Sequence, residues 1–310
     1  MNILIIGLGS IAKKHIAAIR AIDSNASIYA LRSRRDSKAY GGVVDLYSFD
    51  EASKINLDFA IISTPTSEHK KTIHKLLEFR IPLFIEKPVA SSPIDDVINS
   101  INEAGILTYV ACNLRFLESI RFLKNCIASG EIPGRINEVN VYCGSYLPEW
   151  RPGTNFRESY STRAEMGGGV HLDLIHELDY ICWIFGMFES HRAFCRSKSS
   201  LDIDAIDYAK YLLFYEDFAC DITLNYFRRD YKREIEILFD SITWKVDLAK
   251  NCITDSNGVV IFRSEQSGTD TYTEQMRYFF DLVSNNEKDS FNDIIFANEI
   301  LKLCLDYERP

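Results

Sequence analysis

The sequence predicts two domains: a doubly wound α/β domain with a parallel sheet over residues 1–115, and an α+β domain over residues 116–310. In the first part, short apolar runs alternate with amphipathic helical segments. In the second part, strand-like segments follow one another with short turns and no helices between them, which is typical of an antiparallel or mixed sheet. A length of 310 residues accommodates two hydrophobic cores.

The first part begins with a strand followed by a tight turn. The run Asn2–Ile6 is continuously apolar and is followed by a glycine, as expected for a buried parallel strand. A helix should then cover residues 11–22. Pro93 suits the first turn of a later helix, because its missing N–H costs nothing there. Further strands are expected at 27–31, 58–62, 83–85 and 106–110, with a helix at 67–79.

The second part combines long helical patterns with many strands. Helices are expected at 117–129 and 170–185, separated by a strand at 137–147 and a loop at 148–168 rich in Trp, Arg, Pro and Gly. Strands are then expected near 190–197, 207–215, 219–227, 231–239, 242–248 and 258–263, followed by helices at 272–284 and 291–307.

Composition excludes several classes of protein. The chain is 46% hydrophobic and 25% charged, as globular proteins are, and its net charge of −9 argues against broad nucleic-acid binding. Eight scattered cysteines without C-x-x-C spacing indicate reduced thiols in a cytoplasmic protein. The apolar residues 3–12 lack a preceding basic segment, and no run approaches the roughly 18 apolar residues of a membrane span.

A glycine motif follows the first strand and opens the first helix. It reads Gly7-Leu8-Gly9-Ser10-Ile11-Ala12, a G-x-G-x-x-A pattern. The first glycine would make the turn, the second would let backbone approach a pyrophosphate, and Ala12 would let helix and strand pack closely. The helix N-terminus would supply N–H groups for the phosphates. The alternative is a merely glycine-rich turn, but the strand and helix on either side favour a dinucleotide site of the Rossmann type.

The end of the second strand indicates which dinucleotide is preferred. Enzymes that use NAD usually have an acidic residue here for the ribose hydroxyls. This chain instead has Arg32, Ser33 and Arg34, and arginine can bind a 2′-phosphate in bidentate fashion. We therefore expect NADP in preference to NAD, with a solvated basic loop as the alternative.

Three further motifs complete a recognisable pattern. Ser63-Thr64-Pro65, with His69 four residues beyond Pro65, follows a strand, and Glu86-Lys87-Pro88 follows the next one. Three glycines, Gly167 to Gly169, open the segment that contains Asp173 and His176. With the glycine turn, these motifs give a chain that resembles the Gfo/Idh/MocA oxidoreductases over nearly its whole length.

The resemblance implies a fold, an activity and a set of site residues. Family members join a Rossmann domain to an α+β domain with a large open, mostly antiparallel sheet. They bind substrate between the domains and often use the sheet face for subunit contacts, so a homodimer or homotetramer is expected. They transfer hydride between NAD(P) and a carbinol or keto carbon of sugars, cyclitols or nucleotide sugars.

The resemblance also assigns roles to individual residues. Lys87 matches the catalytic lysine, and Asp173 and His176 match the pair that contacts substrate. The family often has a cis bond before the proline that follows the lysine. The residues implied in cofactor binding are Ser63, Thr64, Pro65, His69, Glu86, Lys87, Pro88 and Asn113. Arg115 belongs to a segment that reaches the cleft and is expected to contact substrate.

Two departures from the family pattern stand out. Several members have the aspartate and histidine four residues apart, whereas Asp173 and His176 are three apart, so which of them touches the reacting hydroxyl stays open. Cys112 stands where the family often has an aromatic residue.

The chemistry of the candidate residues fits alcohol oxidation. Removal of a hydroxyl proton as hydride leaves requires a base near neutrality, and Lys87 lies at the carboxyl end of a strand, where open α/β sheets bind ligands. The alternative for Lys87 is a surface lysine in a turn. At a spacing of three, Asp173 and His176 would share one face of a single helix. His176 could alternatively be a core histidine, and His15 is expected to pack in its helix or to contact backbone.

The loop before the glycines supplies candidate substrate contacts. Trp150 can stack on a sugar ring, and Arg151 and Arg157 can meet a phosphate or carboxylate, although a packed Ω-loop would look the same. No metal site is expected, since Asp173 and His176 alone are too few ligands for a catalytic zinc.

Two other functions remain open at this level. One is a dinucleotide-binding regulatory protein of the same fold without catalysis, because fold does not determine activity. The other is a reductase of a non-sugar substrate, such as an aromatic diol or a tetrapyrrole. The presence of Lys87, Asp173 and His176 together favours an enzyme over the regulatory protein, because a protein without catalysis has no chemical need for all three.

Overall fold

The structure, a computed structural model, describes residues 1–309 and divides into two compact units. The first unit comprises Met1–Asn113 and Gly268–Lys302, and the second comprises Leu114–Ser267 and Leu303–Pro310. The chain first passes from one unit to the other between Asn113 and Leu114, beside the expected boundary at residue 115. Nothing in the sequence pattern predicts its return to the first unit at Gly268.

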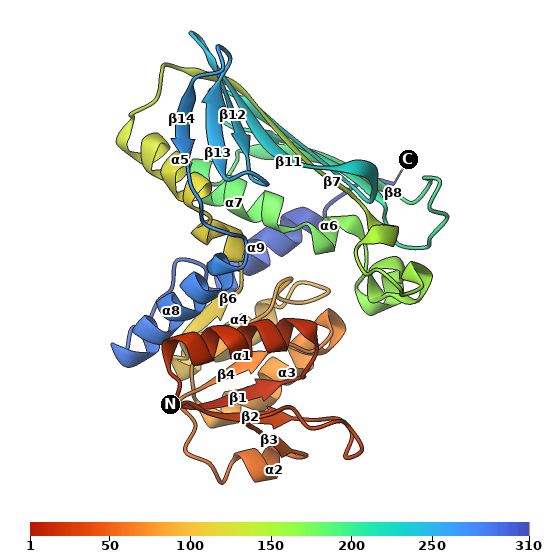
Figure 1. Cartoon of the computed structure of the whole chain (residues 1–310), viewed down its shortest axis with the longest axis vertical. Helices are drawn as coiled ribbons and strands as arrows, with labels where there is room; N and C mark the ends of the chain where they lie inside the picture. The colour runs from red at the N-terminus through yellow and green to blue at the C-terminus, as the bar shows by residue number, and fades with distance from the viewer. Residues whose placement is uncertain (310) are drawn as a thin grey trace. The chain divides into compact units, whose positions relative to one another are not determined.

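The first unit is built on a six-stranded parallel sheet (Figure 1). Its strand order, β3-β2-β1-β4-β5-β6, changes direction between β1 and β4, so the switch point of the sheet lies at the glycine turn. The strands are β1 (Asn2–Ile6), β2 (Ser27–Leu31), β3 (Val43–Leu46), β4 (Phe59–Ile62), β5 (Leu83–Ile85) and β6 (Thr108–Val110). The helices within Met1–Asn113 are α1 (Ser10–Ile22), α2 (Phe49–Ala52), α3 (His69–Leu76) and α4 (Asp95–Ala104).

Some expectations for this unit are wrong in detail. The short elements β3 and α2 are not predicted, because β3 lies at the sheet edge with half-exposed side chains and lacks a continuous apolar run. The expected helix at 67–79 is three pieces: η1 (Thr66–Glu68), α3 and η2 (Leu77–Phe79). Helix α4 begins at Asp95, so Pro93 precedes the helix instead of occupying its first turn.

Two closing helices complete the first unit. Helix α8 (Asp270–Ser284) packs beside α1, and α9 (Ile294–Leu305) follows it. Phe279 of α8 meets Phe59 of β4 and Phe84 of β5 edge to face, with ring centroids 5.1 and 5.4 Å apart. An amphipathic pattern shows that a helix buries one face but not which sheet receives it, so these contacts are invisible in the sequence.

The second unit contains an eight-stranded sheet with the order β14-β13-β12-β11-β7-β10-β9-β8 (Figure 1). Among the strand pairs of this sheet that residues 1–309 form, β10–β7 is the parallel one and the others are antiparallel, so the expectation of a large, mostly antiparallel sheet is confirmed. Its strands are β7 (Ile136–Tyr146), β8 (Ser190–Arg196), β9 (Tyr208–Phe214), β10 (Ala219–Asn225), β11 (Phe227–Phe239), β12 (Thr243–Asp247), β13 (Cys252–Asp255) and β14 (Val260–Arg263). Strand β13 is not predicted.

The helices of the second unit are α5 (Glu118–Ser129), α6 (Val170–Asp173) and α7 (His176–Phe185), and α6 packs on β9 and β10. Along β9, the buried residues Ala209, Tyr211 and Leu213 alternate with more exposed ones, so one face of this strand is in the core. No helix among residues 1–309 is long and apolar enough to span a membrane.

Candidate active site

The glycine turn between β1 and α1 has the geometry that the motif predicts. Gly7 has φ +87°, and a Cβ added there would lie 2.8 Å from the carbonyl oxygen of Ser63, so only glycine fits. Gly9 is the N-cap of α1, and a Cβ added there would meet no atom within 4 Å. The Ser63 hydroxyl donates to the carbonyl oxygens of Ile6 (3.2 Å) and Gly7 (2.9 Å). The end of β4 thereby holds the turn in place.

The surroundings of this turn suit a dinucleotide. No side chain caps the N-terminus of α1, so its first N–H groups are available to phosphate oxygens. The space beside Gly9 lets a ligand approach the backbone. Within residues 1–309, the buried Oγ1 atom of Thr64 has no hydrogen-bond partner, which leaves a polar group for the cofactor. These features fit an NAD(P) molecule.

The basic segment after β2 is only partly open. Nη1 of Arg32 lies 2.8 Å from Oδ1 of Asp45 on β3, and Nη2 donates to the carbonyl oxygen of Lys38 (3.4 Å). Ser33 and Arg34 are exposed. The Asp45 carboxylate therefore neutralises one of the two arginines expected to meet a 2′-phosphate. The sequence does not reveal this pairing, because β3 is not predicted.

Lys87 lies on a turn at the carboxyl end of β5, and hydrogen bonds of Glu86 and His15 hold this turn. The Lys87–Pro88 peptide bond is cis, as the resemblance implies. One carboxylate oxygen of Glu86, Oε1, lies 2.5 Å from Nε2 of His15, and the other, Oε2, accepts the Lys87 backbone N–H (3.3 Å). His15 is completely buried. The expectation that His15 serves in helix packing is confirmed, since its ring lies against Phe84 with centroids 4.9 Å apart. The alternative of a backbone contact is wrong, because the ring nitrogen meets the Glu86 carboxylate instead.

A second histidine, His69, contacts the same turn. Nδ1 of His69 lies 3.0 Å from the carbonyl oxygen of Pro88, and Nε2 lies 2.9 Å from that of Thr64. Burial lowers the pKa of His69, so the neutral ring is favoured. A neutral imidazole donates through one nitrogen only. The ring therefore donates to the carbonyl oxygen of either Pro88 or Thr64 and contacts the other without a hydrogen bond.

Asp173 is held by two tyrosine hydroxyls. The Tyr160 hydroxyl donates to Oδ1 (2.7 Å), and the Tyr226 hydroxyl donates to Oδ2 (2.5 Å). Burial and the neighbouring carboxylate raise the pKa of both phenols, which keeps them protonated as donors. Gly168 permits this arrangement, because a Cβ there would lie 2.1 Å from the Tyr160 carbonyl oxygen. The sequence does not predict the two tyrosines, which lie 13 and 53 residues from Asp173.

The expected single helix over residues 170–185 is wrong. Asp173 ends α6 and His176 begins α7, with a turn at Leu174 and Ile175. The N–H of Ile175 donates to Leu172 and that of Glu177 to Leu174, which are i→i−3 bonds that tighten the chain at this point. Asp173 and His176 therefore do not share one face of a continuous helix. Both are buried, with exposures of 6% and 9%.

Asn113 and Arg115 have partners within their own units. The Asn113 amide donates to Oγ1 of Thr271 (2.8 Å) in the first unit. In the second unit, the fully buried Arg115 makes a two-bond ion pair with Asp179 on α7: Nε to Oδ2 at 2.8 Å and Nη2 to Oδ1 at 2.7 Å. The guanidinium also lies 5.3 Å from the Trp183 ring centroid. The structure places Arg115 where it fixes the start of α7.

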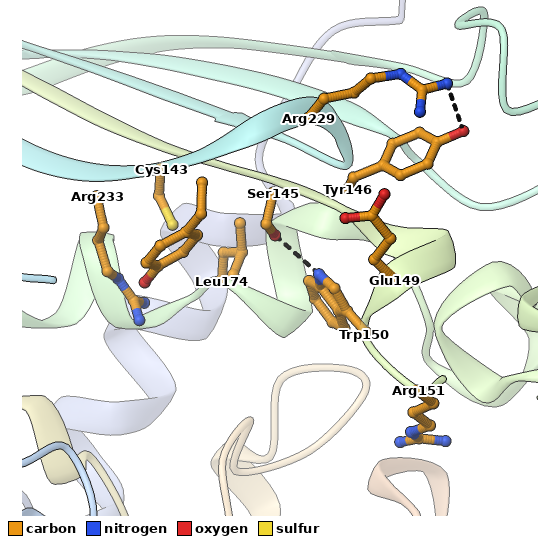
Figure 2. A pocket seen from close by; sticks show the side chains of 10 residues that line it. Cys143, Ser145, Tyr146, Glu149, Trp150, Arg151, Leu174, Arg229 and Arg233 are labelled. Carbon is orange, nitrogen blue, oxygen red and sulfur yellow. Dashed lines mark hydrogen bonds between the residues drawn. The ribbon is translucent and has the colours of Figure 1, made fainter. Parts of the chain in front are cut away.

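The loop at 148–168 forms one wall of a pocket of about 490 Å³ (Figure 2). Trp150 and Arg151 line it, but Arg157 is not among the lining residues. Instead, Nη1 of Arg157 donates to the carbonyl oxygen of Asp202 (2.5 Å). The loop folds into four short 3₁₀ turns: η4 (Leu147–Glu149), η5 (Phe156–Glu158), η6 (Tyr160–Thr162) and η7 (Ala164–Met166).

Potential metal ligands do not gather anywhere in residues 1–309: no three His, Cys, Asp or Glu side chains form a group that could hold an ion. The candidate residues for proton transfer and substrate contact are Lys87, Asp173 with its two tyrosines, and His176.

Solved structures share this fold. Levoglucosan dehydrogenase, in complex with NADH and levoglucosan, has a TM-score of 0.84 at 14% identity, covering 98% of this chain and 95% of that one. The WlbA dehydrogenase from Bordetella pertussis, in complex with NADH and UDP-GlcNAcA, has a TM-score of 0.79 at 20% identity, covering 97% and 92%. UDP-N-acetylglucosamine 3-dehydrogenase from Acidithiobacillus ferrooxidans also has a TM-score of 0.79, at 18% identity over 98% and 95%.

Curated relatives match over shorter stretches. The 2,7-anhydro-N-acetylneuraminate hydratase of Mediterraneibacter gnavus is 28% identical over 136 residues, 43% of this chain and 35% of the relative. Inositol 2-dehydrogenase 1 of Mycolicibacterium vanbaalenii is 24% identical over 195 residues, 60% of this chain and 53% of the relative. The matched segment thus spans about a third to a half of these relatives.

Family models match both parts of the chain. Residues 1–110 match the model described as "Oxidoreductase family, NAD-binding Rossmann fold", and residues 120–244 match the "GFO/IDH/MocA C-terminal domain". Together with the glycine turn and the Glu86-Lys87-Pro88 turn, these matches show that the chain belongs to the Gfo/Idh/MocA oxidoreductase family.

Proposed function

We propose that the chain is an NAD(P)-dependent dehydrogenase or reductase that acts on a secondary alcohol or ketone of a sugar-like substrate. The observation that carries this proposal is the placement of Lys87. The turn that carries Lys87 follows β5 and lies in the same unit as the glycine turn. Glu86, paired with His15, holds this turn by a hydrogen bond, and His69 contacts it. These contacts fix the backbone from which the Lys87 side chain extends, and a fixed backbone helps to position a proton-transfer group.

The first unit would bind the cofactor and supply the base. The N–H groups at the start of α1 would hold the phosphates, and Thr64, through its buried hydroxyl, would bond the nicotinamide end. Bound NAD(P) accepts or delivers hydride. The amine of Lys87 would take the proton from the substrate hydroxyl during oxidation and return it during reduction.

The second unit would orient the substrate. Two tyrosine hydroxyls hold the Asp173 carboxylate in one orientation, and a carboxylate is an acceptor for the hydroxyl groups of a sugar-like substrate. We assign Asp173 to a hydroxyl of the substrate and His176 to the reacting hydroxyl or its proton. Arg115, as a fully buried ion-pair member, is assigned as a positioning residue.

The direct test is a substrate screen. The purified chain would be mixed with NADP⁺ or NAD⁺ and a panel of sugars, cyclitols, uronates and nucleotide sugars, and absorbance of the reduced nicotinamide would be followed. We expect one class to be oxidised. Normal cofactor binding without turnover of any class would support the regulatory alternative. Product analysis is needed beside absorbance, because one relative is named a hydratase.

We expect NADPH to bind more tightly than NADH. Arg34 and Ser33 are exposed beside β2, where a 2′-phosphate would lie, and each charge-assisted hydrogen bond contributes on the order of 1.5–3 kcal/mol. Arg32→Ala combined with Arg34→Ala should remove most of the difference. Calorimetry with both cofactors measures it, with Arg277→Ala on the exposed face of α8 as the control. Tighter NADH binding by the unmodified chain would refute the preference.

We also propose a homodimer or homotetramer assembled through the second sheet. Helix α6 packs on one face of β9 and β10, while the other face carries side chains such as Lys210 and Leu212 of β9 and Asp221 of β10. In Figure 1 the helices α5, α6 and α7 lie along one face of the second sheet, and no helix of residues 1–309 is drawn against its other face. We expect a second subunit to cover that face. A monomeric mass by light scattering at micromolar concentration would argue against it. We also keep the proposal of a cytoplasmic location, which rests on the scattered spacing of the eight cysteines in the sequence.

A further inference from the structure

The pocket in the second unit carries an excess of positive charge. It lies among β7, β11, α6–α7 and the loop after β7, and three guanidinium groups line it: Arg151, Arg229 and Arg233 (Figure 2). Arg233 makes a two-bond ion pair with the fully buried Glu177, at 2.6 and 3.0 Å. Among residues 1–309, Arg151 and Arg229 have no such partner, and Glu149 is the acidic residue of the lining. In a chain with net charge −9, this concentration of cations indicates an anionic ligand.

Aromatic rings form the rest of the wall. Arg229 lies over the Tyr146 ring, 4.1 Å from its centroid, and donates to its hydroxyl (3.1 Å). The Trp150 indole N–H donates to Oγ of Ser145 (2.9 Å), which orients that ring. Tyr231 is 55% exposed. Flat rings beside guanidinium groups are the elements with which proteins bind a nucleobase and its phosphates.

The pocket adjoins the candidate substrate residues of its own unit. The Trp150 ring meets the Tyr226 ring at 90° with centroids 5.3 Å apart, and the Tyr226 hydroxyl bonds Asp173. A sugar ring bound at Asp173 would therefore direct its substituent along Trp150 into the pocket. At about 490 Å³, the pocket is in the range that holds a whole ligand and exceeds what a lone carboxylate needs.

We propose that this pocket binds the nucleoside diphosphate part of a nucleotide-linked sugar. Arg151 and Arg229 lie on opposite sides of Trp150 and Glu149 (Figure 2), as suits a ligand with more than one charge. The guanidinium groups hold the diphosphate, an aromatic ring stacks on the base, and Glu149 accepts from ribose hydroxyls or base N–H groups. This inference rests on the proposed function and narrows its substrate class.

The test measures binding without turnover. Holoenzyme saturated with NADPH, so that the dinucleotide site is filled, is titrated with UDP, dTDP and GDP by calorimetry. We expect at least one to bind, and Arg151→Ala and Arg229→Ala each to weaken that binding about 10-fold to 100-fold. Arg192→Ala, which removes an exposed guanidinium from β8, should leave the dissociation constant unchanged.

The outcomes separate this inference from the proposed function. Failure of all three diphosphates to bind, equal affinity for the unphosphorylated nucleoside, or binding insensitive to both arginine changes would overturn the pocket assignment, even if an uncharged sugar is oxidised. Diphosphate binding that depends on the two arginines, without hydride transfer to or from any nucleotide sugar, would instead keep the pocket and refute the dehydrogenase.

Discussion

Lys87→Met is expected to slow hydride transfer by roughly 100-fold to 10,000-fold, the range for loss of a general acid–base group. Methionine keeps the length and the apolar stem of lysine but has no amine to exchange a proton with the substrate. The glycine turn and the start of α1 are untouched, and the Lys87 backbone N–H still donates to Glu86. Cofactor affinity should therefore change little, so the loss appears in the chemical step.

Single-turnover rates at saturating cofactor measure this effect, because slow product release would otherwise hide it. Calorimetry with NADPH measures the unchanged binding. Lys71→Met provides the matched control, since Lys71 is exposed on α3 in the same unit. A normal rate in Lys87→Met with normal cofactor binding would show that Lys87 is only a turn residue.

His176→Ala extends the comparison. If Lys87 and His176 act on the same proton, the loss in the double variant should be smaller than the product of the two single losses. Independent multiplication of the losses would place them at different steps. A normal rate in Lys87→Met, by contrast, would require the mechanism to be rebuilt around Asp173 and His176.

Removal of the Asp179 carboxylate should have the largest effect on stability. Asp179→Ala leaves the fully buried Arg115 guanidinium without its carboxylate, and breaking a buried pair in this way costs about 3–5 kcal/mol. Replacement of both partners in Arg115→Met/Asp179→Leu should recover much of the loss, because no uncompensated charge stays buried.

Tryptophan fluorescence during urea unfolding measures this effect in the right unit. The three tryptophans, Trp150, Trp183 and Trp244, all lie in the second unit. Asp217→Ala is the control: its ion pair with Arg135 is largely exposed, so its removal should cost under about 1 kcal/mol. A similarly small loss in Asp179→Ala would show that the buried pair does not hold α7, and would return Arg115 to the list of substrate contacts.

Local signals in the sequence determined the parts of this protein that depend on near neighbours. The apolar run Asn2–Ile6 followed by Gly7 predicts β1 and its turn. A buried strand requires consecutive apolar residues, and the positive φ of the turn requires a glycine directly after them. The G-x-G-x-x-A and Glu86-Lys87-Pro88 motifs predict the two loops of the cofactor unit for the same reason. Short turns between β9 and β10 and between β11 and β12 likewise predict these two antiparallel pairs of the second sheet.

Long-range contacts decided the rest, and no local pattern encodes them. The polar edge strand β3 brings Asp45 to Arg32, α8 packs its phenylalanines on the first sheet, and His15 meets Glu86 across 71 residues. Where the sequence predicts one continuous helix, the structure has a turn between α6 and α7.

The sequence by itself thus determined the family, the two kinds of sheet and the identity of Lys87, Asp173 and His176 as candidates. Only the tertiary structure decided what each candidate touches: the carboxylate behind the lysine turn, the two tyrosines on Asp173 and the pocket beside Trp150. The physical reason is that the sequence gives the type of each side chain and its spacing from near neighbours. Its hydrogen-bond partners depend on packing between segments that are far apart in the sequence.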